Sequence, residues 1–228
     1  MFRTYAVVLA VAATLTPAIF AATEADKRLD AAADLVTDMM NASDKGIPQD
    51  LLNRSECVVL VPGLKKAAFV VGAKYGRGFA VCRRANGTGW TAPAAMRIEG
   101  GSVGFQIGAS EQDVLLLVMN LTGMKRLISD KFTLGAEATV AAGPVGRDAT
   151  AQTDAVMRAE MLSYSRSRGL FAGISLQGAT LRPDVDANEE MYGKAITNKE
   201  ILTTDIAAPP AAEKVEMLLN RNSSRKTK

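Results

Sequence analysis

The sequence predicts an α+β fold: a mostly antiparallel β-sheet body, as a barrel or a sandwich, flanked by N-terminal and C-terminal helices. Three observations indicate this class. Residues 132–141 alternate apolar side chains with polar or small ones, which is the period of a strand with one buried face. Asn86-Gly87 between apolar runs is a strong hairpin signal. Residues 23–43 repeat apolar side chains every three or four positions, as an amphipathic helix does.

The first half of the chain predicts two helices followed by a series of strands. Residues 48–54 can start a second short helix after the one at 23–43. The expected strands are 57–61, 67–73, 79–83 and 90–98, joined by turns that include 74–78 and 84–89. We place the strand at 90–98 on a sheet edge, because Pro93 has no N–H to donate to a ladder.

The second half predicts more strands and then helices. One strand should run from Val103 to Ala109, and the next, within 113–120, is apolar on both faces and therefore central. Alternation returns from Leu170 to Leu181. Helices are expected at 121–128, 184–193, 199–202 and 211–220, and the basic tail at 223–228 is expected to be disordered.

The N-terminus has the layout of a secretory signal peptide. Arg3 precedes an apolar run, and small residues follow up to Ala22. We expect cleavage near Ala21 and a periplasmic or secreted protein, with an uncleaved N-terminal anchor as the alternative. The net charge of the 228 residues is +3, which gives no overall attraction to nucleic acid.

Cys57 and Cys82 are the only cysteines in the sequence. An oxidising compartment favours a disulfide between them, which requires Cα atoms about 4.4–6.8 Å apart. Two buried thiols are the alternative.

The residue types argue against catalysis and metal binding. The sequence contains no histidine, which excludes Ser-His-Asp and Cys-His catalysis and removes the commonest zinc ligand. Asp184, Asp186 and Asn188 match the first ligands of a calcium loop, but Glu189 stands where such a loop needs glycine, so helix capping by Asp186 or Asn188 fits better. We expect no metal and no cofactor.

Paired carboxylates and glycine-rich loops are the remaining catalytic patterns to consider. Glu137 with Asp130 could suggest a hydrolase, although a solvated sheet face explains them more simply. The glycines of 72–78 and 100–104 fit neither a phosphate loop nor a dinucleotide fingerprint, so turns and close strand approach explain them.

Several segments between about residues 50 and 193, taken together and in order, resemble the SYLF domain family. They are Lys65-Lys66-Ala-Ala-Phe69, Gly72-Ala-Lys-Tyr-Gly-Arg-Gly78, Gly89-Trp-Thr-Ala-Pro93, Gly104-Phe-Gln-Ile-Gly108, Val114 to Asn120, Lys131-Phe-Thr-Leu-Gly135, Ala142-Gly-Pro-Val-Gly-Arg147, Tyr164-Ser-Arg-Ser-Arg-Gly169 and Leu170-Phe-Ala-Gly-Ile-Ser175. The resemblance implies a non-enzymatic lipid-binding domain. Eukaryotic members bind phosphoinositide-bearing membranes, and a yeast endocytic member is described as binding actin. This chain looks like the secreted bacterial branch, with a signal peptide at 1–22, the domain at 23–205, and a C-terminal helix and tail at 206–228.

Basic residues beside the expected turns are candidates for an anion-binding surface, since Arg and Lys bind phosphate oxygens. They are Lys65, Lys66, Lys74, Arg77, Lys131, Arg147, Arg166 and Arg168. We expect them to converge on one patch that binds an anionic phospholipid or membrane surface. The alternative is a protein-interaction or structural module whose basic loops meet an acidic protein, as with actin in the eukaryotic relatives.

Overall fold

The computed structural model describes residues 22–42, 46–69, 71–103, 108–146, 158–167 and 170–224. The strands are β1 (Cys57–Phe69), β2 (Val71–Cys82), β3 (Ala94–Val103), β4 (Gly108–Val118), β5 (Phe132–Thr133), β6 (Val140–Ala142), β7 (Met161–Ser167), β8 (Leu170–Gly173) and β9 (Thr180–Pro183). The helices are α1 (Glu24–Asn41), α2 (Gln49–Arg54), α3 (Leu121–Leu127), α5 (Val185–Tyr192), α6 (Asn198–Thr203) and α7 (Glu213–Asn222), with a 3₁₀ turn at Pro210–Ala212.

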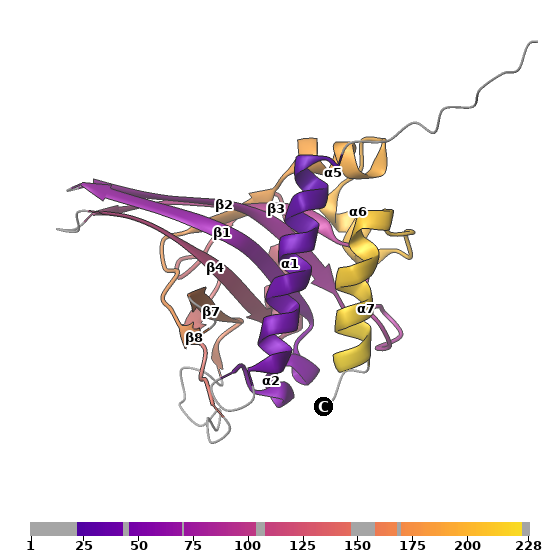
Figure 1. The fold of residues 1–228 in the computed structure, drawn as a ribbon, viewed down its shortest axis with the longest axis horizontal. Helices are drawn as coiled ribbons and strands as arrows, with labels where there is room; N and C mark the ends of the chain where they lie inside the picture. Colours follow the sequence, from indigo (N-terminus) through magenta and orange to yellow (C-terminus); the bar gives the residue numbers. More distant parts are fainter. Residues whose placement is uncertain are drawn as a thin grey trace, which may run out of the picture.

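The strands form one curled sheet, a half-barrel, with helices packed on it (Figure 1). Their order is β5-β9-β3-β2-β1-β4-β7-β6, and β8 pairs with β7. Neighbouring strands are antiparallel except β6 and β7, which are parallel. The predicted α+β class with helices at both ends of the chain is confirmed.

Each face of the sheet carries its own hydrophobic core. On the face that we call the α1 face, Leu29 and Val36 of α1 and Leu219 of α7 pack against side chains such as Val58 and Phe79. On the opposite face, the α3 face, Leu127 of α3 and Ile201 of α6 pack against Val59, Val61, Leu64 and Ile98. Side chains alternate between the two faces along β1, so this strand contributes residues to both cores.

The predicted helices are confirmed, with ends that differ by a few residues. In α1 the N-cap Thr23 and Asp26 form a capping box, which satisfies the first free N–H groups of the helix. The last helix, α7, packs on α1, and Lys214 Nζ lies 3.0 Å from Asp34 Oδ1. The two ends of the described chain thus meet on one face of the sheet.

The turn predicted at 74–78 is wrong, because these residues lie inside β2. β1 and β2 form one long hairpin, and the register of β1 shifts between Leu60 and Lys65. Gly78 lies against that irregularity: a Cβ there would be 2.0 Å from the carbonyl oxygen of Leu60. The glycines that suggested a turn instead allow two backbones to approach closely.

The continuous strand predicted over 132–141 is also wrong. Only Phe132–Thr133 and Val140–Ala142 are strands, and the chain turns between them at Gly135, whose φ is +83°. Glu137 accepts a hydrogen bond from the backbone N–H of Thr133 at 2.8 Å, so it belongs to the turn rather than to a solvated sheet face. The alternation arose because both arms of this turn bury apolar side chains.

Two further strand predictions need correction. β3 lies between β2 and β9, so the segment after Pro93 is interior and not an edge; Pro93 precedes the first strand residue and costs the ladder nothing. Val103 and Ala109 belong to two different strands, β3 and β4, and residues 104–107 lie outside the described residues. The prediction that β4 is central holds, because it runs between β1 and β7.

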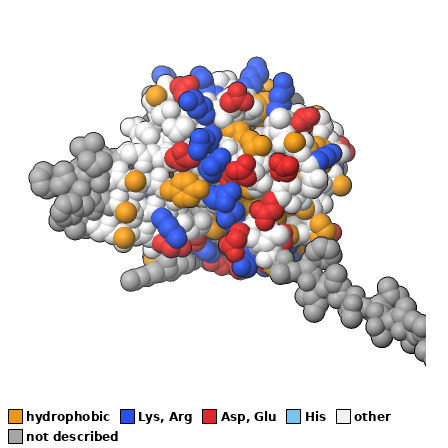
Figure 2. Space-filling view, turned by 90° about the horizontal axis from the view of Figure 1, so that it is seen from above, with side chains coloured by type: hydrophobic (Ala, Val, Ile, Leu, Met, Phe, Trp, Pro, Cys, Tyr) orange, Lys and Arg blue, Asp and Glu red, His pale blue; other side chains and the backbone are white. Residues whose placement is uncertain are grey.

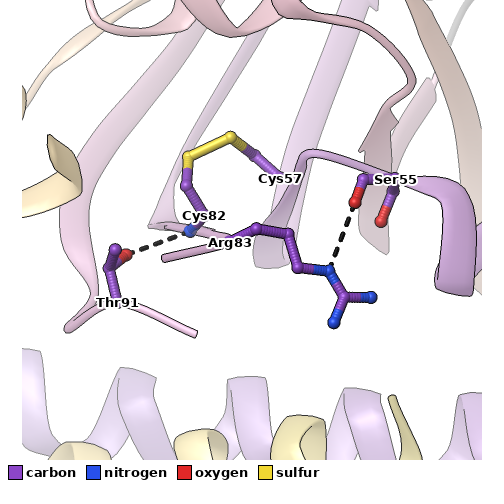
Figure 3. Close-up of a disulfide and its surroundings, with 5 residues drawn as sticks. All are labelled: Ser55, Cys57, Cys82, Arg83 and Thr91. Atoms are coloured by element: carbon purple, nitrogen blue, oxygen red, sulfur yellow. Dashed lines mark hydrogen bonds between the residues drawn. A yellow bond between two sulfur atoms is a disulfide. The ribbon is translucent and has the colours of Figure 1, made fainter. Parts of the chain in front are cut away.

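Cys57 and Cys82 form a disulfide between β1 and β2 (Figure 3). The two residues are directly opposite each other in the ladder, and their Cα atoms are 3.9 Å apart, closer than the expected range. Arg83, the next residue, is buried, lies 3.9 Å over the Trp90 ring and donates to the backbone carbonyl of Ser55. The bridge therefore lies within a buried, hydrogen-bonded part of the sheet.

Candidate functional site

Three of the predicted basic residues lie together near the free end of the β1–β2 hairpin. Lys65 of β1 is opposite Tyr75 of β2, and Lys66 is opposite Lys74. Figure 1 shows that these strand ends, with those of β3 and β4, project beyond the helices. We call this part the ribbon: residues 64–69 and 71–75 of the hairpin with 99–103 and 108–112 beside it.

The basic residues lie on both faces of the ribbon. Lys65 and Tyr75 share the α1 face with Glu111 of β4, which is opposite Lys65. Lys66 and Lys74 share the α3 face with Ser110, which is opposite Lys66. Together, Lys65, Lys66, Lys74 and Tyr75 lie at one level on the two faces of the middle strands of the ribbon, β1 and β2, and we call them the collar.

Beyond the collar, the α1 face carries small apolar side chains. Ala67 is opposite Ala73 on one side and Ala109 on the other, and all three are exposed. Seen from above, Lys and Arg gather in a band across the molecule with Asp and Glu among them, whereas the projecting part carries small hydrophobic side chains (Figure 2). The ribbon thus changes from charged to apolar toward its free end.

Lys66 and Lys74 lie in an unfavourable electrostatic environment. Partial burial lowers the pKa of both ammonium groups, and the charge of Lys74 lowers the pKa of Lys66 further. Within the described residues neither forms an ion pair. These two residues therefore carry charge that the described part of the chain leaves uncompensated.

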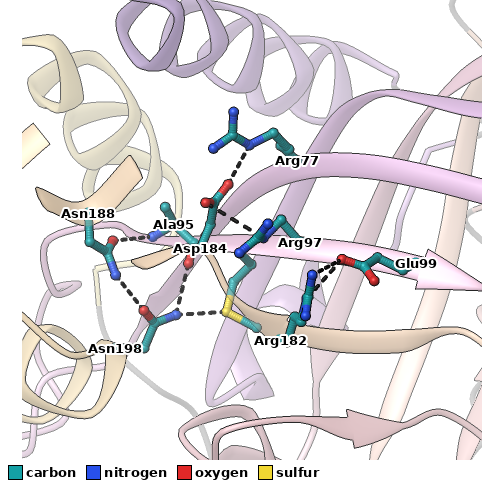
Figure 4. Close-up of polar contacts among 9 residues, drawn as sticks. Arg77, Ala95, Arg97, Glu99, Arg182, Asp184, Asn188 and Asn198 are labelled. Atoms are coloured by element: carbon teal, nitrogen blue, oxygen red, sulfur yellow. Dashed lines mark hydrogen bonds and ion pairs between the residues drawn. The ribbon is translucent and has the colours of Figure 1, made fainter. Parts of the chain in front are cut away.

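Arg77 does not join the collar as a free cation. It forms an ion pair with Asp184, whose side chain is 0% exposed, and Arg97 Nε lies 3.6 Å from the other carboxylate oxygen (Figure 4). Burial raises the pKa of Asp184, but the hydrogen bond and charge of Arg77, with the charge of Arg97, outweigh burial and leave the pKa below its usual value. This cluster joins α5 to the sheet.

The residues that suggested a calcium loop have other roles. Asp184 compensates the two arginines, and Asn188 Oδ1 accepts from the backbone N–H of Ala95 at 2.7 Å while its amide donates to Asn198. Asn188 therefore does not cap a helix, contrary to the prediction from the sequence. No group of metal-ligating side chains occurs in the described residues.

Arg166 also belongs to a structural ion-pair network. Its Nε lies 2.8 Å from Asp113 Oδ2, and its guanidinium reaches Asp38 of α1. These contacts connect β7, β4 and α1, so Arg166 holds the first helix to the sheet. Sequence reasoning missed the partners, because Asp38 is 128 residues away in the chain.

The other predicted basic residues do not add to the collar. Lys131 is exposed next to β5 and lines a small cavity with Lys125, Arg126 and Glu137, away from the ribbon. Arg147 and Arg168 lie outside the described residues. The structure therefore brings together Lys65, Lys66 and Lys74. Arg77, which lies beside the collar on β2, and Arg166 are engaged in ion pairs, and Lys131 lies elsewhere, next to β5.

A cavity of about 410 Å³ beside α6 was not predicted from the sequence. Arg83, Arg84, Met124, Leu202 and Asp205 contribute to its lining. Arg84 is ion-paired with Asp205, and Arg83 donates to buried backbone carbonyls, so both cations are already engaged.

Among the described helices, none has the length and apolar character that crossing a bilayer requires.

Comparison with known proteins adds the family. The model of the Ysc84 family, described as "Las17-binding protein actin regulator", matches residues 99–222. The chain belongs to this family. The match confirms the SYLF resemblance, because SYLF and Ysc84 denote the same domain family. The bacterial branch stays a prediction.

Similar proteins come from yeasts and mammals. The chain is 37% identical over 177 residues to "SH3 domain-containing protein PJ696.02" of Schizosaccharomyces pombe, covering 76% of this chain and 41% of that protein. It is 34% identical to "LAS seventeen-binding protein 3" of Saccharomyces cerevisiae (75% and 38% covered) and 33% identical to the human "SH3 domain-containing YSC84-like protein 1" (79% and 52% covered). The chain spans about two fifths to one half of these relatives. Of these three names, "LAS seventeen-binding protein 3" describes a binding protein.

Proposed function

We propose that the protein binds anionic phospholipid membranes, without catalysis, and that the ribbon is the docking element. The observation that carries the proposal is the collar: three lysines and a tyrosine lie on the two faces of a projecting sheet end, and Ala67, Ala73 and Ala109 form an outer row beyond them on the α1 face. Tyrosine and lysine are residue types that occupy the membrane–water interface, with the polar end of the side chain in the headgroups. Tyr75 is 47% exposed and so is available for such contact.

We expect the affinity of the collar for an anionic membrane to be modest. Each basic residue near an anionic surface contributes about 1 kcal/mol, so the three collar lysines give weak docking. Glu111 opposite Lys65 reduces the attraction on the α1 face. Binding should therefore fall steeply when salt shortens the range of the electrostatic attraction.

Vesicle sedimentation tests this proposal. The purified protein should sediment with phosphatidylserine vesicles at low salt, and binding should fall with added salt and with phosphatidylcholine in place of phosphatidylserine. Changing Lys65, Lys66 and Lys74 together to Gln should abolish most of the binding. The matched control is Lys131→Gln, which removes one exposed lysine away from the ribbon and should leave binding close to that of the unchanged protein. Full binding by the triple variant would contradict the assignment.

A protein partner is the second candidate, and the family description favours it. In that case the collar lysines would contact an acidic protein, and the family description suggests actin as the class of partner. Co-sedimentation with actin filaments, in parallel with vesicles, separates the two candidates: filament binding without vesicle binding would favour the protein-interaction module.

Export is part of the same proposal. Residues 1–22 have the pattern of a signal peptide, and they would take the protein to the periplasm or out of the cell. N-terminal sequencing of the protein isolated from cells should find a start near Ala22. A chain that retains Met1 would contradict cleavage.

A further inference from the structure

Two lysines face each other on the α3 face of the ribbon with no carboxylate among their ladder neighbours. Lys66 and Lys74 are Cα partners, so their side chains leave the sheet on the same face. Their other partners in the ladder are Ser110 and Gly100, neither of which carries charge. Like charges directly opposite each other in a sheet are destabilising, and partial burial weakens the screening by water.

The side chains around this pair add hydrogen-bond donors. Ser110 is directly opposite Lys66, and Gln112 lies two residues further along the same face of β4. The Nε2 atom of Gln112 is buried and has no hydrogen-bond partner within the described residues. A lysine ammonium has three donors and no acceptor, so the cluster offers donors from four side chains. An acceptor-rich anion is the group that would satisfy them.

The stem of Lys74 is held in place from the other side. Gly100 lies opposite Lys74, and a Cβ at Gly100 would be 3.3 Å from Lys74 Cγ and 3.1 Å from Ala179 Cα. The aliphatic part of Lys74 therefore packs against the backbone at Gly100, close to the 178–179 turn. This contact places the first part of the Lys74 side chain over Gly100.

We propose that Lys66, Lys74, Ser110 and Gln112 form a binding site for a phosphate monoester. A monoester carries close to two negative charges above its second pKa of about 6 and compensates both ammonium groups, whereas a diester carries one charge. Charge-assisted hydrogen bonds from lysine to phosphate oxygens are the stronger kind. The inference rests on the proposed function for the source of the ligand, which is a lipid headgroup at the membrane surface that the ribbon meets.

A soluble probe tests the site without any membrane. Methyl phosphate at pH 8 should bind the protein and raise the pKa of Lys66 and Lys74, measured by NMR of the lysine Cε and Nζ signals, while Lys131 stays unchanged. Dimethyl phosphate, the diester, should have no such effect. In the Lys66→Gln, Lys74→Gln double variant the affinity for methyl phosphate should fall by at least about tenfold, since two charged hydrogen-bond donors are lost.

Vesicles test the lipid source. At equal surface charge, vesicles of phosphatidic acid, a monoester, should bind better than those of phosphatidylglycerol, a diester. The double variant should lose this preference, whereas Lys65→Gln, which removes a lysine from the opposite face of the same strand, should keep it while binding both vesicles more weakly. Circular dichroism checks that each variant folds.

The outcomes separate this site from membrane docking itself. Vesicle binding with no preference for the monoester and no response of Lys66 or Lys74 to methyl phosphate would overturn the site and leave the proposed function standing. A response to methyl phosphate without vesicle binding would support the site as one for free phosphate monoesters and overturn the proposed function. An undiminished response in the double variant would overturn the site.

Discussion

At Asp184, two arginines compensate one buried carboxylate. Arg77 pairs with it directly and Arg97 lies 3.6 Å away. Replacement by Asn should lower the free energy of unfolding by about 1.5–3 kcal/mol, the range for hydrogen bonds to charged groups. Urea titration at pH 7 measures this loss.

The pH dependence at Asp184 follows from the direction of its shift. The folded-state pKa is depressed, so the stabilisation is present above the unfolded pKa of about 3.9 and is lost as pH falls through the folded value. The difference in the free energy of unfolding between Asp184→Asn and the unchanged protein should therefore become smaller in acid. Asp205→Asn is the matched control, because that carboxylate is 78% exposed in its pair with Arg84. Equal losses of unfolding free energy in Asp184→Asn and Asp205→Asn would contradict the stabilising role of the buried carboxylate.

Gly78 is required by the close approach of β1. An alanine Cβ would lie 2.0 Å from the Leu60 carbonyl oxygen. Because that oxygen belongs to the backbone, only movement of the backbone can relieve the clash. Gly78→Ala should destabilise the protein by about 1–3 kcal/mol, the usual cost of overpacking. At Gly101 the nearest atom to a Cβ is 3.9 Å away, so Gly101→Ala in thermal unfolding is the control. A tolerated Gly78→Ala would show that the hairpin register is different.

For charged residues, clustering along the sequence could be predicted, whereas ion pairs between distant segments could not. Lys65, Lys66 and Lys74 were found from their clustering in the sequence, and the hairpin keeps them together. Arg77 and Arg166 could not be recognised as paired, because Asp184 is 107 residues from the first and Asp38 is 128 from the second. Arg97, which completes the Asp184 cluster, gave no signal beyond its charge.

At the scale of elements, the disulfide ties the base of the β1–β2 hairpin. It joins residues 25 apart in the sequence and lies at the inner end of the two longest strands. Replacing both cysteines by Ala should lower the free energy of unfolding by about 2–4 kcal/mol. Denaturant titration measures that cost.

Mass spectrometry provides a direct check on the bridge. Alkylation of the unfolded protein should modify neither cysteine before reduction and both after it. Two modified cysteines in the absence of reductant would contradict the disulfide.

The helices could be predicted from the sequence, whereas two turns could not. Helical periodicity over α1 and caps such as Thr23 depend on neighbours in the chain, so local reasoning finds them. The glycines at 76 and 78 meet Leu64 and Leu60 of another strand, and a local pattern cannot distinguish that contact from a turn. In residues 132–141, two arms of one turn bury side chains in the same core and imitate a strand.

At the scale of the whole molecule, shape determines the proposed function. The helices cover one end of the sheet, and β1 to β4 extend beyond them as the ribbon (Figure 1). The position of the ribbon depends on strand lengths and register, which composition and periodicity leave open. Of the eight basic residues expected in one patch, Lys65, Lys66 and Lys74 lie on the two faces of one projecting end, and Arg147 and Arg168 lie outside the described residues.

Depth-dependent fluorescence quenching tests the docking orientation most directly. Trp90 is the only tryptophan and is buried, so it gives a constant background. In Ala73→Trp the new side chain lies on the outer row of the ribbon, and in Met217→Trp it replaces a residue of α7 that is 64% exposed. With brominated anionic vesicles, bromine in the upper acyl chains should quench the tryptophan at 73 and not the one at 217. Quenching at 217 with none at 73 would contradict docking through the ribbon.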